Sequence, residues 1–340
     1  MLLQAIISLI LTGTAVVVAG TVLARGGDTI AARTGLGGLW IGTIFLATAT
    51  SLPELTTDIA AVRMGLPDLA AGDLFGSSMA NMLILALVSL IPGTELFRKA
   101  ALENALLISL AMILTAIAAI TIVMGPSVGF MRVGPGSALL AIVYLVGARL
   151  IFQRSSIARE AGLVEEMSAV TETEEGETDA RGSLRRAVIS SAAAALVILV
   201  AAPFFASAAS DIADATGISV SFVGTWLLGF STSLPELATS LAAVRMRAYD
   251  LAVGNLFGSN CFNMTMFVLL DVAHGQQPVL SAVDPVHVLS ALIALVLMGI
   301  GLAAVVSRAQ RRGSLAEPSG AMMVLVYVAG LALVYLKSQG

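Results

Sequence analysis

Two glutamates occupy positions in this sequence where a carboxylate is unusual. Glu54 and Glu236 each lie about 15 residues inside a strongly apolar segment, and each follows the proline of a Thr-Ser-Leu-Pro-Glu motif. An ionisable group at such depth in a membrane segment is energetically costly and usually marks an ion or proton path. A glutamate near a helix end that reaches outward explains the pattern less well, because the residue recurs beside a proline in both halves of the chain.

Oxygen-bearing residues accompany each glutamate at steps of three and four, which places them on one face of a helix. The first apolar segment contains Thr43, Thr50, Ser51, Glu54, Thr57 and Asp58, and its counterpart contains Thr225, Thr232, Ser233, Glu236, Thr239 and Ser240. The segments that follow add Asp73, Ser77 and Asn81 in the first half and Asn255, Ser259 and Asn263 in the second. Four polar stripes can therefore converge on one point.

This set of candidate ligands consists of oxygen atoms. Hard cations such as calcium take about 6–8 oxygen ligands, whereas soft transition metals prefer thiolate or imidazole. Two carboxylates balance the charge of one calcium ion. A proline interrupts the helix after Ala47 and after Gly229, so their backbone carbonyls can join the ligand set where they line a cavity. The pattern predicts a hard-cation site and no cofactor.

The elements that hold these residues are apolar segments long enough to cross a membrane. Of the 340 residues, 58% are hydrophobic and 12% are charged, against about 25% charged in a soluble domain. A transmembrane helix needs about 20 mostly apolar residues. We predict an all-α integral membrane protein with ten transmembrane helices. They cover roughly 3–24, 37–62, 69–92, 102–124, 133–153, 187–208, 219–244, 250–272, 286–306 and 320–336.

The sequence also contains a long internal repeat. Residues 42–82 align with 224–264 at a constant offset of 182, and 25 of the 41 aligned positions are identical. The offset maps the first five segments onto the last five, and an odd number of crossings per half means that the halves enter the membrane from opposite faces. Such inverted repeats are typical of secondary transporters, whose sites lie near the midplane between the halves. The single cysteine, Cys261, aligns with Met79 and is interpreted as a packing residue.

The predicted domains are a first repeat over 1–153, an acidic linker over 154–186 and a second repeat over 187–340. The linker is too polar to bury a core. Lysine and arginine accumulate in cytoplasmic loops. If the ten segments cross the membrane in alternating directions, 15 of the 18 basic residues fall on one side. This distribution places the linker in the cytoplasm and both termini outside, and the lack of a long regulatory domain suits a prokaryotic inner membrane.

The chain resembles the sodium/calcium exchanger family of the calcium/cation antiporter superfamily. The resemblance rests on the two Gly-Thr…Thr-Ser-Leu-Pro-Glu-Leu segments, each followed by Gly-Asp/Asn-Leu-Phe-Gly-Ser, and it implies alternating-access exchange of sodium for calcium. It implies that calcium binds Glu54, Glu236, Thr50, Thr232 and the backbone of Ala47 and Gly229. It also implies that Ser51, Ser77, Ser233 and Ser259 complete sodium sites, and that Asn81 and Asn263 line the centre.

The chain departs from the family pattern at several polar positions. Family members often have an aspartate where this chain has Asn263, and usually have an asparagine at the position of Asp73. Asp58 is a further acid, so Asp58 and Asp73 are predicted modulators of coupling. Calcium/proton or other cation/proton antiport therefore stays open as an alternative.

An intramembrane enzyme or a passive channel fits the sequence less well. The apolar segments contain no lysine, and their one histidine, His287, falls at the outer edge of its segment, so neither supplies a partner for a catalytic carboxylate or serine; a channel does not require two inverted halves. The expected partners are the transported cations calcium and sodium and the lipid bilayer. No basic patch of the kind that binds nucleic acid is present, and the sequence does not define an oligomeric state.

Overall fold

The computed structural model describes residues 2–36, 38–91, 96–99, 102–125, 132–167, 177–216, 229–308 and 318–338, and nearly all of them are helical. The first half contains α1 (Leu2–Thr34), α2 (Gly38–Trp40), η1 (Ile41–Leu46), α3 (Ala47–Thr50), α4 (Leu52–Arg63), α5 (Pro67–Ser89), α6 (Leu96–Lys99), α7 (Leu102–Met124) and α8 (Pro135–Met167). The second half contains α9 (Glu177–Thr216), α11 (Leu234–Arg245), α12 (Tyr249–His274), α13 (Val279–Ala282), α14 (His287–Arg308) and α15 (Pro318–Ser338).

Within these ranges, eight helices are long and apolar enough to cross a membrane. They are α1, α5, α7, α8, α9, α12, α14 and α15, and each coincides with one predicted segment. The two remaining predictions, 37–62 and 219–244, fall on helices that are interrupted at the Thr-Ser-Leu-Pro-Glu motifs. Residues 219–228 of the latter lie outside the described residues. The all-helical, two-repeat membrane fold predicted from the sequence is therefore confirmed.

The interruption of each motif helix is local. In the first half a π-helical stretch, η1, leads into α3, and the chain then bends at Ser51 (φ −89°, ψ 5°) before α4 begins. Ser233 has nearly the same conformation (φ −83°, ψ 5°) immediately before α11. The bend follows from the proline two residues later, which suits the first turn of a helix but cannot continue the preceding hydrogen-bond ladder. Each glutamate is thereby placed in the first turn of the new helix.

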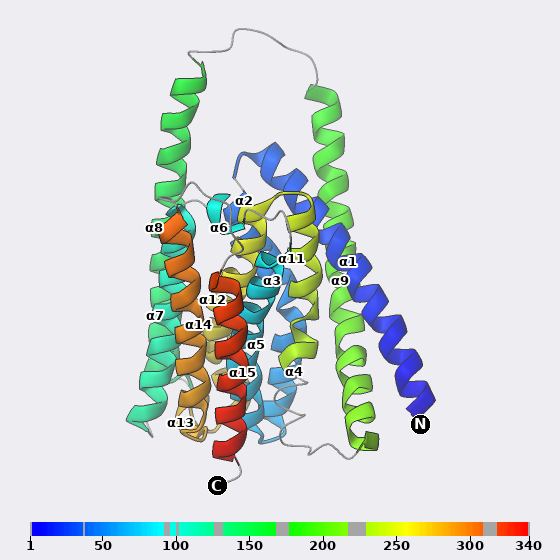
Figure 1. Cartoon of the computed structure of the whole chain (residues 1–340), viewed down its shortest axis with the longest axis vertical. Coiled ribbons are helices and arrows are strands. Elements are labelled where there is room, and N and C mark those ends of the chain that lie inside the picture. The colour runs from blue at the N-terminus through cyan, green and yellow to red at the C-terminus, as the bar shows by residue number, and fades with distance from the viewer. Residues whose placement is uncertain are drawn as a thin grey trace.

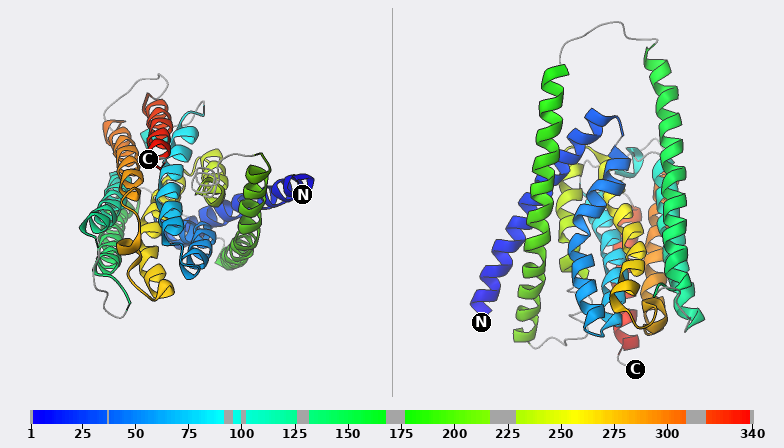
Figure 2. Two further views of the ribbon diagram at one scale, coloured as in Figure 1. Left: turned by 90° about the horizontal axis from the view of Figure 1, so that it is seen from below. Right: turned by 180° about the vertical axis from the view of Figure 1, so that it is seen from behind.

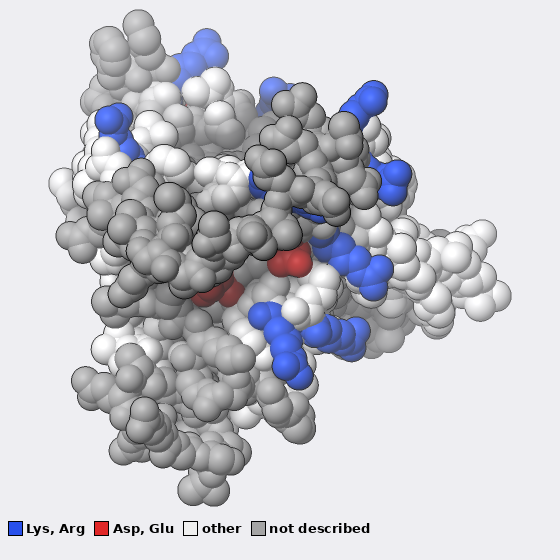
Figure 3. Space-filling model, turned by 90° about the horizontal axis from the view of Figure 1, so that it is seen from above, with Lys and Arg blue, Asp and Glu red and all other residues white. Residues whose placement is uncertain are grey.

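The helices form a bundle with two flanks, and both termini lie at the end opposite to the one where α8 ends and α9 begins (Figures 1 and 2). Helix α1 packs along α9 on one flank, whereas α7, α8, α14 and α15 cover the other. Helices α5 and α12 lie innermost. In the most apolar stretch of α5, 83% of the residues are buried, whereas in the corresponding stretches of α1 and α8 only 22% are. Figure 3 shows basic side chains distributed around the end of the bundle where α8 ends and α9 begins.

Three helices are longer than the apolar pattern predicts. Helix α1 continues to Thr34, ten residues past the predicted end, and α8 and α9 extend into the predicted linker, so that 168–176 alone separates them outside the described residues. The extension of α1 is held by close helix packing, because a Cβ on Gly26 would collide with Ser191 Oγ on α9. Polar residues end an apolar segment, but they do not end a helix.

The two halves interleave at the centre of the bundle. Helix α12 packs against α2, η1, α3 and α4, and α5 packs against α11, α14 and α15. Glycines permit this approach: a Cβ on Gly42 would lie 2.5 Å from Leu251 O, and one on Gly258 would lie 2.6 Å from Thr43 Cα. Small residues let helices approach closely in membranes, and at Gly42 and Gly258 the helix backbones nearly touch.

Candidate cation-binding site

Glu236 lies in the first turn of α11 and receives hydrogen bonds from both halves of the chain. Ser51 Oγ, at the bend of the first-half motif, donates to Glu236 Oε1 at 3.1 Å, and Ser259 Oγ on α12 donates to the same atom at 3.3 Å. Glu236 is fully buried, and its Oε2 receives no hydrogen bond. The carboxylate is thus oriented by two hydroxyl groups and retains a free oxygen.

Glu54 is equally buried but has no such donors. Neither of its carboxylate oxygens has a hydrogen-bond partner, and its exposed fraction is 0%. Its carboxyl group interacts electrostatically with those of Glu236, Asp73 and Asp58. Burying a charged carboxylate without a partner is energetically unfavourable, so the carboxylate of Glu54 would be stable here only with a proton or a cation bound.

The predicted carbonyl ligands keep their helical hydrogen bonds. Ala47 O accepts from Ser51 N at 3.0 Å, and Gly229 O accepts from Ser233 N at 3.2 Å. A carbonyl oxygen has two lone pairs, so each can still contact a cation with the second. Ser233 Oγ, the counterpart of Ser51 Oγ, has no hydrogen-bond partner.

The prolines release two other carbonyls, which sequence reasoning overlooked. Pro53 and Pro235 have no N–H, so Ala49 O and Ser231 O lose the donor that lies four residues later in a regular helix. Counting four residues back from each proline identifies these atoms, whereas the predicted positions, Ala47 and Gly229, lie two residues earlier. All four carbonyls belong to the turn that precedes a bend.

The two motif threonines make matched contacts across the interface between the halves. Thr50 Oγ1 donates to Leu46 O at 3.0 Å and lies 3.4 Å from Asn255 Oδ1 on α12. Thr232 Oγ1 lies 3.1 Å from Asp73 Oδ1 on α5. Each motif helix therefore contacts the inner helix of the other half. Thr50 meets the amide group of Asn255, whereas Thr232 meets the carboxylate of Asp73.

Ser77 on α5 lies beside the second-half bend. Its Oγ is 3.4 Å from Thr232 Oγ1 and 3.5 Å from Gly229 O. The backbones are also close at this point, since a Cβ on Gly229 would lie 3.3 Å from Ser77 N. The structure thus brings Ser77, Thr232 and Gly229 together, as the sequence predicts for one part of the site.

The central asparagines present unused polar atoms. Asn81 Nδ2 on α5 donates to Asn260 Oδ1 on α12 at 2.9 Å. Asn81 Oδ1 and both polar atoms of Asn263 have no hydrogen-bond partner, although both side chains are completely buried. Buried amides normally satisfy their hydrogen-bonding groups, so free amide oxygens at the centre indicate a place for a ligand.

The cluster contains no protein cation. Every buried charged side chain among the described residues is an aspartate or glutamate, and in the same part of the chain no three His, Cys, Asp or Glu side chains are close enough to hold one metal ion. A cation here would therefore take at most two carboxylates and complete its shell with hydroxyl, amide and backbone oxygens. This composition matches the hard-cation ligand set predicted from the sequence.

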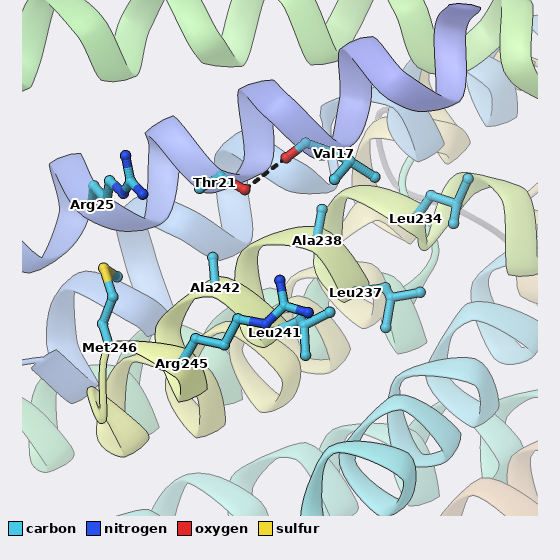
Figure 4. A pocket seen from close by; sticks show the side chains of 10 residues that line it. All are labelled: Val17, Thr21, Arg25, Leu234, Leu237, Ala238, Leu241, Ala242, Arg245 and Met246. Atoms are coloured by element: carbon cyan, nitrogen blue, oxygen red, sulfur yellow. Dashed lines mark hydrogen bonds between the residues drawn. The ribbon is translucent and has the colours of Figure 1, made fainter. Parts of the chain in front are cut away.

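A cavity elsewhere in the molecule is not lined by these carboxylates. It has a volume of about 370 Å³ and opens between α1 and α11, as Figure 4 shows. Its lining is mostly apolar, and its charged residues are Arg25 and Arg245. Two arginines repel a cation, so this cavity does not suit the ions that fit the buried cluster.

The chain is similar to a known protein family and to solved structures. The family model described as "Sodium/calcium exchanger protein" matches residues 4–165 and 186–336, which leaves out most of the acidic linker. The structure of the sodium-calcium exchanger NCX_Mj superposes with a TM-score of 0.72 at 22% identity, over 98% of this chain and 99% of that chain. At this identity the superposition shows that the two share a fold.

Curated relatives show similarity over about two thirds of the chain. An uncharacterised membrane protein of Methanocaldococcus jannaschii is 28% identical over 69% of this chain and 70% of its own length. The inner membrane protein YrbG of Escherichia coli is 27% identical over 68% of each chain. A sodium/calcium exchanger of Methanosarcina acetivorans, MaX1, is 27% identical over 39% of this chain and 36% of its own.

Proposed function

We propose that this chain, which belongs to the sodium/calcium exchanger protein family, exchanges calcium for sodium across a membrane by alternating access. Membership of the family makes it a cation antiporter, and the choice of calcium and sodium is our inference. The observation that carries it is the buried pair Glu54 and Glu236, contributed by opposite halves with no basic residue buried among the described residues. A site between inverted halves is reached from either side when the halves move relative to each other.

The ligand chemistry favours calcium as one of the transported ions. Glu54 and Glu236 together balance the two charges of one calcium ion, and neither oxygen of Glu54 is engaged by the protein. Thr50, Thr232 and the carbonyls of Ala47 and Gly229 complete an oxygen shell, as the family resemblance implies. Calcium tolerates the irregular geometry that such a mixed shell provides.

Sodium would use overlapping positions. We assign its sites to the four motif and inner-helix serines, with the two central asparagines between them: Ser51, Ser77, Ser233, Ser259, Asn81 and Asn263. Ser51 and Ser259 now donate to Glu236, and rotation of either hydroxyl would present its oxygen to a cation. Because sodium and calcium compete for Glu54 and Glu236, binding of one displaces the other, which is the requirement for exchange.

A cation/proton antiporter is the second candidate. The observation that favours it is the additional buried acids, Asp58 and Asp73, which are each 1% exposed. A buried carboxyl group can carry a proton in one transport state and release it in another. The two candidates differ in the gradient that drives calcium.

The orientation follows from the charge distribution. Basic side chains surround the end of the bundle where α8 ends and α9 begins (Figure 3), and cytoplasmic loops collect lysine and arginine. We therefore place that end and the linker in the cytoplasm and both termini outside. YrbG is named an inner membrane protein, and we propose the same location for this chain.

Transport into reconstituted vesicles tests this function. Vesicles loaded with sodium are diluted into sodium-free buffer with radioactive calcium, beside potassium-loaded, acid-loaded and protein-free vesicles, all at clamped voltage. We expect calcium uptake that requires the outward sodium gradient. Uptake that follows the proton gradient alone would transfer the chain to the second candidate, and uptake without any gradient of a second ion would refute antiport.

A further inference from the structure

The α1–α11 cavity combines apolar walls with two arginines at one end. Its α1 wall is formed by Val17, Thr21 and Arg25, which recur every four residues and so share one face of the helix. Its α11 wall follows steps of four and three residues, through Leu234, Ala238, Leu241 and Arg245. Figure 4 shows these two helix faces opposite each other, with one arginine on each.

Between the arginines and the motif bend the walls offer no free polar group. Thr21 is the one uncharged polar side chain among the residues that line the cavity, and its Oγ1 donates to Val17 O of the same helix at 2.9 Å. Val17 is 52% exposed, and Leu237 and Leu241 are half-buried. Apolar surface of this kind is stabilised by contact with hydrocarbon and not with a polar solute.

The depth of the cavity matches one leaflet of a bilayer. Helix α11 has 12 residues from Leu234 to Arg245, which at the helical rise corresponds to about 17 Å. Half of the hydrocarbon core of a bilayer is about 15 Å thick. Leu234 directly follows the bend at Ser233, and inverted-repeat transporters have such interruptions near the midplane. The arginines therefore lie at the depth of the lipid headgroups.

The charge at this end of the cavity is positive and available. Arg25 and Arg245 are exposed, and neither forms an ion pair with a described residue. No acidic side chain is among the described residues that line the cavity. A guanidinium group binds phosphate oxygens with paired hydrogen bonds, so two of them at headgroup depth favour a phosphate-bearing anion.

The other half of the chain does not repeat this arginine pair. At the offset of 182, Arg245 aligns with Arg63 at the end of α4, but Arg25 aligns with Ser207 on α9. Since the halves are inverted, that counterpart belongs to the opposite end of the bundle. The pair thus lies at the end where basic side chains gather (Figure 3). On the proposed orientation this end meets the cytoplasmic leaflet, whose anionic lipids attract basic segments.

We propose that an anionic phospholipid binds in the α1–α11 cavity, with an acyl chain along the apolar walls and its phosphate at Arg25 and Arg245. This lipid site is separate from the ion site and does not depend on which cations are exchanged. Leu234 and Leu237, which line the cavity, flank Glu236 in α11. The bound lipid therefore contacts the helix that carries one carboxylate of the ion site.

Mass spectrometry of the intact full chain in detergent tests the proposal, by titration with phosphatidylglycerol or with phosphatidylcholine of the same acyl chains. The double substitution Arg25→Gln with Arg245→Gln removes both charges from the cavity. Arg33→Gln with Arg186→Gln is the matched control, because it removes two exposed arginines of the same end that do not line the cavity. Ala242→Phe keeps the arginines but fills the space between the helices.

We expect the wild type to bind one phosphatidylglycerol more tightly than phosphatidylcholine. The Arg25/Arg245 variant should lose about 30-fold in affinity for phosphatidylglycerol, the effect of two basic residues near an anionic lipid surface. The Arg33/Arg186 control should bind as the wild type does, and Ala242→Phe should bind more weakly.

Four results would overturn the proposal: equal affinity for the two lipids, no loss in the Arg25/Arg245 variant, the same loss in the control, or unchanged binding by Ala242→Phe. A dimer that forms without lipid and separates in the Arg25/Arg245 variant would assign the cavity to a second copy of the chain instead. Since lipid binding is measured without ion gradients, failure of the exchange function would leave these outcomes unchanged.

Discussion

The two halves of the chain share the Thr-Ser-Leu-Pro-Glu motif, but their glutamates have different surroundings. Glu236 accepts hydrogen bonds from Ser51 and Ser259, whereas Glu54 accepts none. The residues that would make the equivalent bonds, Ser233 and Ser77, are present. Ser233 Oγ has no partner and Ser77 contacts Thr232 and Gly229 instead. The difference therefore comes from packing and not from composition.

This asymmetry fits the requirement of alternating access. Two inverted halves cannot present the same arrangement to both sides of the membrane at once, so they must differ in any one state. We expect the roles to exchange in the opposite state, with Ser233 and Ser77 donating to Glu54 while Glu236 loses its donors. The carboxylate without donors is the one prepared to meet an ion.

Neutralising either glutamate should have the largest effect. Glu54→Gln or Glu236→Gln removes half of the charge that balances calcium, and losing one partner of a buried charge pair costs about 3–5 kcal/mol. Calcium affinity should fall at least about 100-fold, and vesicle uptake should drop to background with normal expression. Normal exchange by either variant would show that its glutamate is not a ligand.

The same two variants separate the halves when stability is measured. In calcium-free detergent, Glu54→Gln should raise the midpoint of thermal unfolding more than Glu236→Gln does. The first substitution removes a buried charge without a donor, whereas the second also weakens two hydrogen bonds to a carboxylate, at about 1 kcal/mol each. Exposed Asp28→Asn controls for a general effect of charge. The opposite order would contradict the asymmetry of the two surroundings.

The central asparagines should give a smaller effect. Asn260→Ser copies Ser78 of the first half and removes the partner of Asn81 Nδ2, which should lower the free energy of unfolding by about 1–3 kcal/mol. Ser78→Asn is the reverse change, and it should supply a partner for Asn263 and reduce access of an ion to that side chain. Unfolding and calcium titrations measure the two effects. A stability that is insensitive to Asn260→Ser would mean that the Asn81 contact contributes nothing.

The repeat and its spacing were sufficient to predict most of the fold. The apolar segments mark eight of the long helices, and the proline motifs mark the bends at Ser51 and Ser233. The end of α1 at Thr34 could not be predicted, because contact between Gly26 and α9 holds its polar turns. Helix length there depends on tertiary packing.

Which residues bind ions stays a prediction from the sequence, and the way these residues pair could not be predicted. Helical spacing identifies Ser51 and Glu236 as polar positions, yet nothing in the sequence indicates that they are hydrogen-bonded across 185 residues. Alignment of the repeats likewise shows Asp58 and Asp73 opposite Ser240 and Asn255, but only the structure shows that Asn255 fills its place with donors. Residue types follow from sequence, whereas satisfied and unsatisfied partners follow from geometry.

The aligned pair Met79 and Cys261 should show the smallest effect on calcium transport, because here the halves differ in residue type but not in role. Both side chains are buried, at 4% and 0% exposure, and the thiol of Cys261 is not in a disulfide. Cys261→Ala removes one sulfur atom and should cost about 1 kcal/mol, whereas Met79→Ala should cost about 2–5 kcal/mol, as for other large-to-small core changes. Calcium uptake per folded molecule should stay within about twofold of wild type in both, since no ligand is lost. Loss of uptake in Cys261→Ala with intact folding would place the thiol in the ion path and end the interpretation of this position as packing.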